Sequence, residues 1–356
     1  MSSVKNTYKD TLLLIADILS FENPHHDLKQ KIVSTQIDWE QFVTVASDHL
    51  VLTTSYCRLK SKELLQYLPK DLEVYLKEIT LINRNRNLTL IKDIKLIATI
   101  FNTHNINHVF LKGSAFLIGN YYKDVGERMI GDIDILIEEN KILKAYDLLL
   151  NQGYSKLPSG LKSTFFDHKH LDRLTLNEGL CAIELHKYVL NKPFDKLLLS
   201  SVILDEKQFI DTIAIPGPNH LYTHNILNFQ INDKAHYYSK ISMRSVYDTL
   251  ILLKAFPKLL KTSHHKYLNS YLSLHSIFLK EFNTIKLDLS KIKRFETRLK
   301  SSKLNSFHKK KLEIYALLNV IPSRLNLYFT NKNYRSAIHK ERGRIFKELK
   351  SNFLKN

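Results

Sequence analysis

Residues 131–137 place two aspartates, one residue apart, inside an apolar run that reads Gly-Asp-Ile-Asp-Ile-Leu-Ile. Alternate residues of a strand point to opposite faces, so Asp132 and Asp134 would share one face and the isoleucines the other. Neighbouring carboxylates repel each other unless a cation lies between them, and carboxylate oxygens suit Mg²⁺. The run therefore predicts a strand with one face in a core and the other at a metal site. The alternative is a pair of turn-capping aspartates that face solvent on an edge strand.

A second polar feature precedes this run, where residues 109–114 read Val-Phe-Leu-Lys-Gly-Ser. A strand that ends at Lys112 and a helix that opens at Ser114 would leave backbone N–H groups free for an anion, with Gly113 allowing close approach. Ser114 would then cap the helix or bind a phosphate oxygen. Lys112 would contact phosphate or simply end an edge strand in solvent. Beside the aspartates, this turn predicts a nucleotide phosphate site.

A third carboxylate, Glu184, lies in the apolar stretch Cys-Ala-Ile-Glu-Leu-His at residues 181–186. Strand alternation puts Glu184 and His186 on the same face. If this strand lies beside the aspartate strand, Glu184 can bind a second metal or act as general base on an acceptor hydroxyl. Glu184 could instead pair with Arg128 or Arg173. His186 would position Glu184 or the acceptor, or be a structural group.

The spacing of apolar residues changes twice along the chain. Apolar residues recur at helical spacing from about residue 8 to 105, short strand-like runs alternate with helices to about 218, and helical spacing returns from 220 with breaks near Pro257 and Pro322. This pattern predicts an α+β fold, with a small mixed β-sheet core between helical regions. We divide the chain into residues 1–105, 106–218 and 219–356. Within the core we predict strands over 107–112 and 132–137, helices over 114–122 and 141–152, the latter ended by Gly153, and a hairpin of 173–176 with 181–188.

The net positive charge of the chain comes entirely from residues 251–356. The net charge is +18, and residues 251–356 contain 24 basic and 6 acidic residues, which is the whole excess. Such a region predicts contact with a polyanion, either nucleic acid or an anionic membrane face. The alternative is a set of ordinary lysine-rich helix faces in solvent.

Cysteine content and hydropathy indicate the cellular compartment of the protein. Two cysteines cannot build a disulfide framework, which favours a reducing compartment. No segment approaches the roughly 20 apolar residues of a membrane span, and no signal peptide is evident. We therefore expect a cytoplasmic protein.

These residues give the chain a family resemblance. It resembles the nucleotidyltransferase superfamily that includes DNA polymerase β and, within it, a bacterial family of largely uncharacterised nucleotidyltransferases. The superfamily pattern is a hydrophobic residue, Gly with Ser or Gly, an acidic pair on a strand and a third acid on a later strand, here Leu111, Gly113-Ser114, Asp132, Asp134 and Glu184. The family likeness extends over roughly residues 30–250 and adds Lys112, Tyr122, Arg128, the run 183–186, Arg244 and Asp248. The 17 residues between Ser114 and Asp132 are more than many minimal members have.

The resemblance implies Mg²⁺-dependent transfer of a nucleoside monophosphate from an NTP, with release of pyrophosphate at a two-metal site. Arg128 would contact the triphosphate or only orient Asp132. Together with the motifs, the resemblance implies that catalysis and metal binding lie at Asp132, Asp134 and Glu184. It implies nucleotide binding at Lys112, Gly113, Ser114 and Arg128, and an acceptor-side role for His186.

Two functions fit the sequence. The first is an enzyme that transfers AMP, or another NMP, from NTP to a hydroxyl or amine on a small molecule, an RNA end or a protein. The second is a non-catalytic RNA- or partner-binding module on a decayed transferase core, for which the basic C-terminal region argues. Because all three acids are present, the sequence favours the enzyme. No short motif specifies the base, the acceptor or the oligomeric state.

Overall fold

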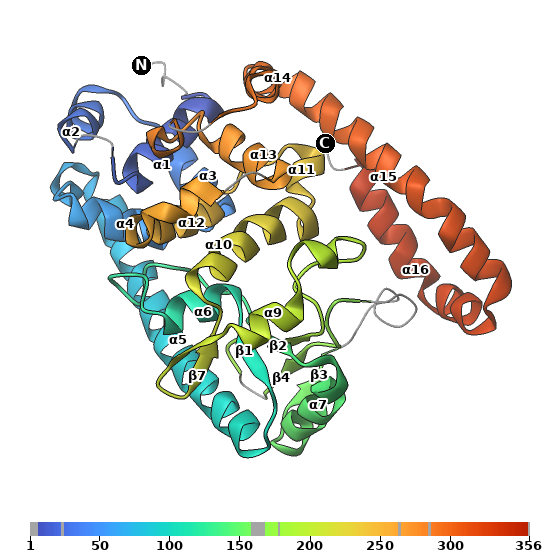
Figure 1. Cartoon of the computed structure of the whole chain (residues 1–356). Helices are drawn as coiled ribbons and strands as arrows, with labels where there is room; N and C mark the ends of the chain where they lie inside the picture. Colours follow the sequence, from blue (N-terminus) through green and yellow to red (C-terminus); the bar gives the residue numbers. More distant parts are fainter. Residues whose placement is uncertain are drawn as a thin grey trace. The chain divides into compact units, whose positions relative to one another are not determined.

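The fold comes from a computed structural model of the chain, in which residues 6–22, 25–157, 168–176, 179–262, 265–283 and 286–354 are described. A small mixed sheet has helices before and after it in the sequence (Figure 1), so the predicted α+β fold is confirmed. The chain divides into two compact units, residues 1–157 with 169–300, and residues 158–168 with 301–356. The first unit contains parts of all three predicted regions, and that three-part division stays a prediction.

The helical N-terminal region is confirmed. Thr7 and Asp10 form a capping box that starts the first helix, and Asp38 caps the third. The last helix is the longest of these and buries a stripe that includes Leu90, Ile94 and Ile97. The elements are α1 (Tyr8–Leu19), α2 (His25–Ser34), α3 (Trp39–Asp48), α4 (Leu52–Ser61), η1 (Leu65–Tyr67) and α5 (Lys70–Thr103).

The main sheet has five strands in the order β1-β2-β5-β4-β3. The β2 and β5 strands pair in parallel, whereas the other pairs are antiparallel, so the predicted neighbours are confirmed. Both faces of β2 are buried, because Leu136 is as inaccessible as the isoleucines. The strands are β1 (His108–Phe110), β2 (Ile133–Ile137), β3 (Ser155–Lys156), β4 (Leu174–Thr175) and β5 (Ile183–His186).

The connections differ from prediction mainly at Lys112. This residue is not a strand end in solvent but the first residue of a helix, with a left-handed φ of 50°. Gly153 follows α7 with φ of 88°, as expected for a helix-ending glycine. The hairpin of β4 with β5 is confirmed, although residues 177–178 of its turn lie outside the described part. The elements that connect or follow these strands are α6 (Lys112–Ile118), η2 (Glu139–Lys141), α7 (Ile142–Asn151), η3 (Phe194–Leu197) and α9 (Ser200–Asp205), and an unpredicted second hairpin, β6 (Gln208–Ile210) with β7 (Ile213–Ile215).

The C-terminal part is helical, as predicted. The break at Pro257 is confirmed, but the break at Pro322 is wrong, since one helix continues through that proline. A proline removes one backbone hydrogen bond, and the rest of a long helix can continue on either side. Among the described helices, none is long and apolar enough to cross a membrane. The elements are α10 (Pro218–Leu227), the π-turn η4 (Asn228–Asn232), α11 (Ala235–Tyr238), α12 (Met243–Ala255), η5 (Pro257–Thr262), α13 (Lys266–His275), η6 (Lys280–Phe282), α14 (Leu289–Leu299), α15 (Ser302–Thr330) and α16 (Lys332–Leu354).

Candidate functional site

The register of the two parallel strands puts two acids side by side. Asp134 on β2 lies directly opposite Glu184 on β5. His186, two residues further along β5, points to the same face, and its Nε2 lies 2.8 Å from Asp134 Oδ1 and 3.3 Å from Glu184 Oε2. One potential ligand atom from each of the three residues lies within 4.8 Å of the others. All three side chains are buried, so this is a preformed polar cluster in an apolar sheet.

Lys112 and His186 compensate the charge of Asp134. The ammonium of Lys112 lies 2.5 Å from Asp134 Oδ1. Burial alone would raise the pKa of Asp134, but Lys112 and His186 outweigh it and hold that pKa well below its usual range. The carboxylate thus stays charged inside the protein.

Arg173, one residue before β4, connects the other two acids. Its Nη2 lies 2.6 Å from Asp132 Oδ2 and its Nε lies 2.7 Å from Glu184 Oε1. Burial raises the pKa of Glu184, but hydrogen bonds from His186 and Arg173 lower it to about 2. Burial raises the pKa of Asp132, and the attraction of Arg173 only partly offsets this effect. Asp132 is the more exposed aspartate and lies one residue before β2, so the cluster around Asp134 does not include it.

The turn before α6 is built around Gly113. A Cβ at this position would collide with Nη1 of Arg128 and press on Ile130, so only glycine lets the guanidinium pack here. Leu111, not Ser114, is the N-cap of α6. The Ser114 hydroxyl is fully buried and has no hydrogen-bond partner among the described residues.

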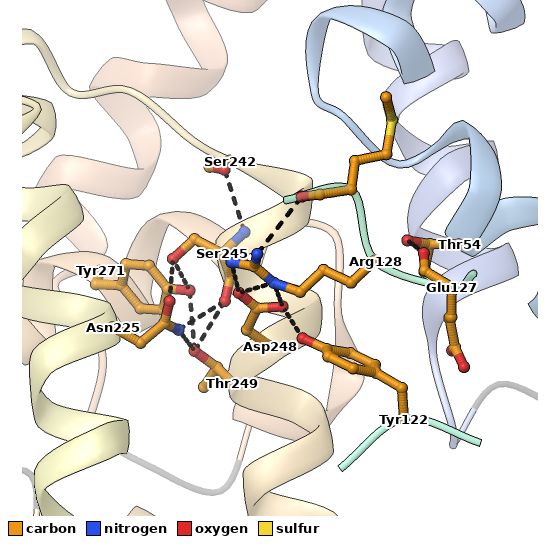
Figure 2. Close-up of polar contacts among 11 residues, drawn as sticks. Thr54, Tyr122, Glu127, Arg128, Asn225, Ser242, Ser245, Asp248, Thr249 and Tyr271 are labelled. Carbon is orange, nitrogen blue, oxygen red and sulfur yellow. Dashed lines mark hydrogen bonds and ion pairs between the residues drawn. The ribbon is translucent and has the colours of Figure 1, made fainter. Parts of the chain in front are cut away.

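Arg128 is held by an acid that lies far along the chain, on α12. Its Nε lies 3.1 Å from both carboxylate oxygens of Asp248, and its Nη2 lies 2.8 Å from Oδ2 (Figure 2). Tyr122 donates its hydroxyl to the same carboxylate. Arg128 therefore does not orient Asp132, and it does not pair with Glu184. Nη1, beside Gly113, lies 3.4 Å from the Met129 carbonyl oxygen, which is a long contact.

The long connection between Ser114 and Asp132 is anchored by the N-terminal helices. On α4, the hydroxyls of Thr53 and Thr54 donate to the Glu127 carbonyl, at 2.9 and 2.8 Å. On α5, the amides of Asn83 and Asn87 donate to backbone carbonyls of residues 125–128. These hydrogen bonds hold the extra residues in an ordered loop, and this loop places Arg128 beside Gly113.

A small cavity opens beside Lys112. It has a volume of about 280 Å³ and lies among α6, α10, the π-turn and α12. The cationic side chains that line it are Lys112, Arg128 and Arg244, accompanied by the acids Asp48, Asp233 and Asp248. The buried His224 also faces this cavity, and burial, together with Lys112 and Lys169, lowers its pKa to about 3. The cavity therefore offers cationic, acidic and neutral polar groups next to the carboxylate cluster.

Sequence reasoning missed several residues of this site. Arg173 was considered only as a partner of Glu184, yet it also binds Asp132. Lys169 interacts electrostatically with Asp134 and Glu184, and burial followed by the repulsion of Lys112 lowers its pKa to about 8. No motif marks Lys169, because its neighbourhood depends on where residues 169–173 run beside β5.

Comparison with known proteins agrees with this geometry. A search of curated proteins gives no match to the chain. The sequence model of one protein family, described as uncharacterised nucleotidyltransferase, matches residues 35–271, well over half of the chain. That segment contains the three acids, the Lys112 turn, Arg128 and Asp248. The chain belongs to the uncharacterised nucleotidyltransferase family.

Proposed function

We propose that the protein transfers a nucleoside monophosphate, AMP in the first instance, from an NTP to a hydroxyl or amine and releases pyrophosphate. The observation that carries this proposal is the pairing of Asp134 with Glu184 on adjacent parallel strands, next to Lys112. Lys112 and Arg173 balance the charge of this acid pair in the structure, and a bound divalent cation would take over part of that role. Family membership supports a nucleotide as the substrate.

The donor set fits a hard divalent cation such as Mg²⁺. Asp134 and Glu184 would supply carboxylate oxygens, and Asp132 would join them from the exposed side. His186 Nε2 already donates toward both buried carboxylates, which suits a residue that orients the ligands. When bound, the metal ions would activate the acceptor oxygen and neutralise charge on the triphosphate.

The remaining side chains position the nucleotide. The buried hydroxyl of Ser114, which has no hydrogen-bond partner in the described part of the chain, would donate to a phosphate oxygen. Arg128 keeps Nη1 beside Gly113 because Asp248 holds its other nitrogens, so this guanidinium is oriented before a phosphate arrives. Lys112 would exchange part of its bond with Asp134 for a phosphate oxygen.

The acceptor class is tested by transfer of label. The protein would be incubated with each α-labelled NTP, Mg²⁺ and RNA, protein or small-molecule fractions of a lysate. Label in one fraction, with matching pyrophosphate release, would identify base and acceptor. Asp134→Asn should abolish the label, and Asp147→Asn, an exposed acid on α7, should not. Transfer that persists in Asp134→Asn would contradict the proposal.

The alternative is a non-catalytic RNA- or partner-binding module. It rests on the basic residues of segment 251–356, most of which are exposed on the described C-terminal helices. This function predicts RNA binding that weakens steeply with salt and is indifferent to Asp134→Asn.

A further inference from the structure

A larger cavity lies on the other side of the loop that carries Arg128. It has a volume of about 690 Å³, within the range typical of small-molecule sites. Its walls are the end of α1, α4, the loop before β2 and α12, and no residue lines both this cavity and the smaller one beside Lys112. The larger cavity is therefore separate from the carboxylate cluster.

The walls of this cavity carry more positive than negative charge. Four cationic side chains line it, and none of them forms an ion pair within the described part of the chain: Arg58, Lys60, Lys123 and Lys254. Its two acids are already engaged. Asp124 accepts two hydrogen bonds from Arg84, at 3.0 and 2.7 Å, and Glu127 accepts one from the Tyr247 hydroxyl.

The electrostatic interactions among the side chains that line the larger cavity also indicate an excess of positive charge. Burial lowers the pKa of Lys254, and repulsion by Lys123 and Arg58 lowers it further. Burial raises the pKa of Glu127, and the hydrogen bond from Tyr247 and the attraction of Arg58 only partly offset this effect. The cavity therefore favours an anion.

Aromatic rings form the apolar part of the wall. The guanidinium of Arg58 lies 4.1 Å from the centre of the Phe21 ring, and the Lys254 ammonium lies 4.3 Å from it. Tyr247 stacks on Phe21 with ring centres 5.9 Å apart, and Tyr121 contributes a third ring to the lining. Rings next to cations suit a ligand that has both a flat apolar group and a negative charge.

A covalent role for this cavity is disfavoured. Cys57 is the only cysteine among the lining residues, and burial, with Glu127 next, raises its pKa to about 12. A thiol with that pKa is almost entirely protonated at neutral pH and is a poor nucleophile. The site is therefore suited to reversible binding.

We propose that this cavity is a second ligand site, which binds a small anion carrying an aromatic ring, such as an aryl phosphate or an aromatic carboxylate. The proposal does not depend on nucleotide transfer. The site also has a direct connection to Arg128. Glu127 and Arg128 are consecutive, as are Tyr247 and Asp248, and each residue of the loop bonds its counterpart on α12. Figure 2 shows the Glu127 and Arg128 side chains leaving the loop on different sides.

The test measures binding of 1-naphthyl phosphate to the full chain by calorimetry, with inorganic phosphate as the ring-free comparison. We expect one site per chain and at least about tenfold weaker binding of inorganic phosphate, because the ring contributes contacts of its own. Lys123→Ala with Lys254→Ala should weaken naphthyl phosphate binding at least about tenfold. The matched control is Lys77→Ala with Lys95→Ala, two exposed lysines of α5, which should change it less than about twofold.

Three results would overturn the proposal. One is equal binding by wild type and the Lys123/Lys254 variant. Another is equal affinity for inorganic and naphthyl phosphate. The third is competitive displacement of the probe by Mg-ATP, since this would place the probe in the cavity beside Lys112. Circular dichroism and thermal unfolding of each variant would show that lost binding is not lost folding.

Discussion

At the scale of single residues, Asp134 has the most demanding environment, because a buried carboxylate must be compensated by its neighbours. Asp134→Asn removes the charge that Lys112 and His186 face. We expect nucleotide transfer to fall by at least about 10³-fold, since the proposed metal would lose a central ligand. The free energy of unfolding should fall by about 1–3 kcal/mol, because the buried ammonium loses its counter-charge.

The measurements are pyrophosphate release and urea unfolding, with Asp147→Asn as the control. Wild-type activity in the Asp134→Asn variant would exclude Asp134 from the catalytic site.

The buried pair of Arg128 with Asp248 makes a separate prediction. Asp248→Asn should destabilise the protein by about 3–5 kcal/mol, because it leaves a buried guanidinium without its counter-charge. Arg128→Met together with Asp248→Leu should recover stability relative to Asp248→Asn, since neither charge remains. Urea unfolding of the single and double variants measures both effects. If Asp248→Asn unfolds like wild type, the pair contributes nothing to stability.

The sequence identified the acids and named Arg173 as a possible partner of Glu184, which is confirmed, but it did not identify the partners of the other acids. Alternation put Glu184 and His186 on one face of their strand, because strand geometry is local, but only the parallel register of β2 with β5 shows that Asp134 lies beside them. The partner of Arg128 lies 120 residues away, and only the packing of α12 brings it close. Family resemblance named Asp248, but no local pattern linked it to Arg128.

At the scale of elements, the turn between β1 and α6 requires a glycine at position 113. Gly113→Ala would push a methyl group into Arg128 and Ile130. We expect at least about tenfold weaker NTP binding and a loss of about 1–3 kcal/mol of stability from overpacking. Gly131→Ala is the matched control, since a Cβ there meets no atom within 4 Å.

Equilibrium dialysis with labelled ATP measures the first effect, and thermal unfolding measures the second. Equal affinity in the Gly113 and Gly131 variants would show that the turn tolerates a side chain.

Prediction of elements succeeded where the sequence signal was local. The long helical stretches, the two main strands and the stop at Gly153 all followed from periodicity or a single residue type. The hairpin of β6 with β7 was missed because its strands have three residues each, too few for alternation to be visible. The break at Pro322 was wrong because the flanking helix is long enough to continue past one lost bond.

At the scale of the whole molecule, buried histidines make stability depend on pH. The His275 ring donates Nδ1–H to the Tyr271 carbonyl at 2.8 Å, and its Nε2 accepts from the Ser242 N–H at 3.2 Å. Only a neutral ring can do both, and burial lowers the pKa of His275 to about 4. The unfolded chain binds this proton below pH of about 6.5. Stability should therefore decrease as pH falls from about 6.5 towards 4, by about 1.4 kcal/mol per pH unit from this group.

Urea unfolding between pH 7.5 and 4.5 measures this slope. His275→Gln lacks the titrating ring, so its slope should be smaller by about the same 1.4 kcal/mol per pH unit. An unchanged slope would mean that His275 takes up its proton without opening the fold.

The separation of Arg128 from Asp248 also bears on how the chain is made. The ribosome adds about 5–20 residues per second, so the arginine emerges roughly 6–24 s before its partner aspartate. During that interval the residues of α12 have not been synthesised. Arg128, in the loop that α4 and α5 anchor, therefore has no Asp248 with which to pair. A nascent chain that stops short of α12 would keep this loop open to proteases. Residue 248 must therefore be synthesised before Arg128 can form its ion pair with Asp248.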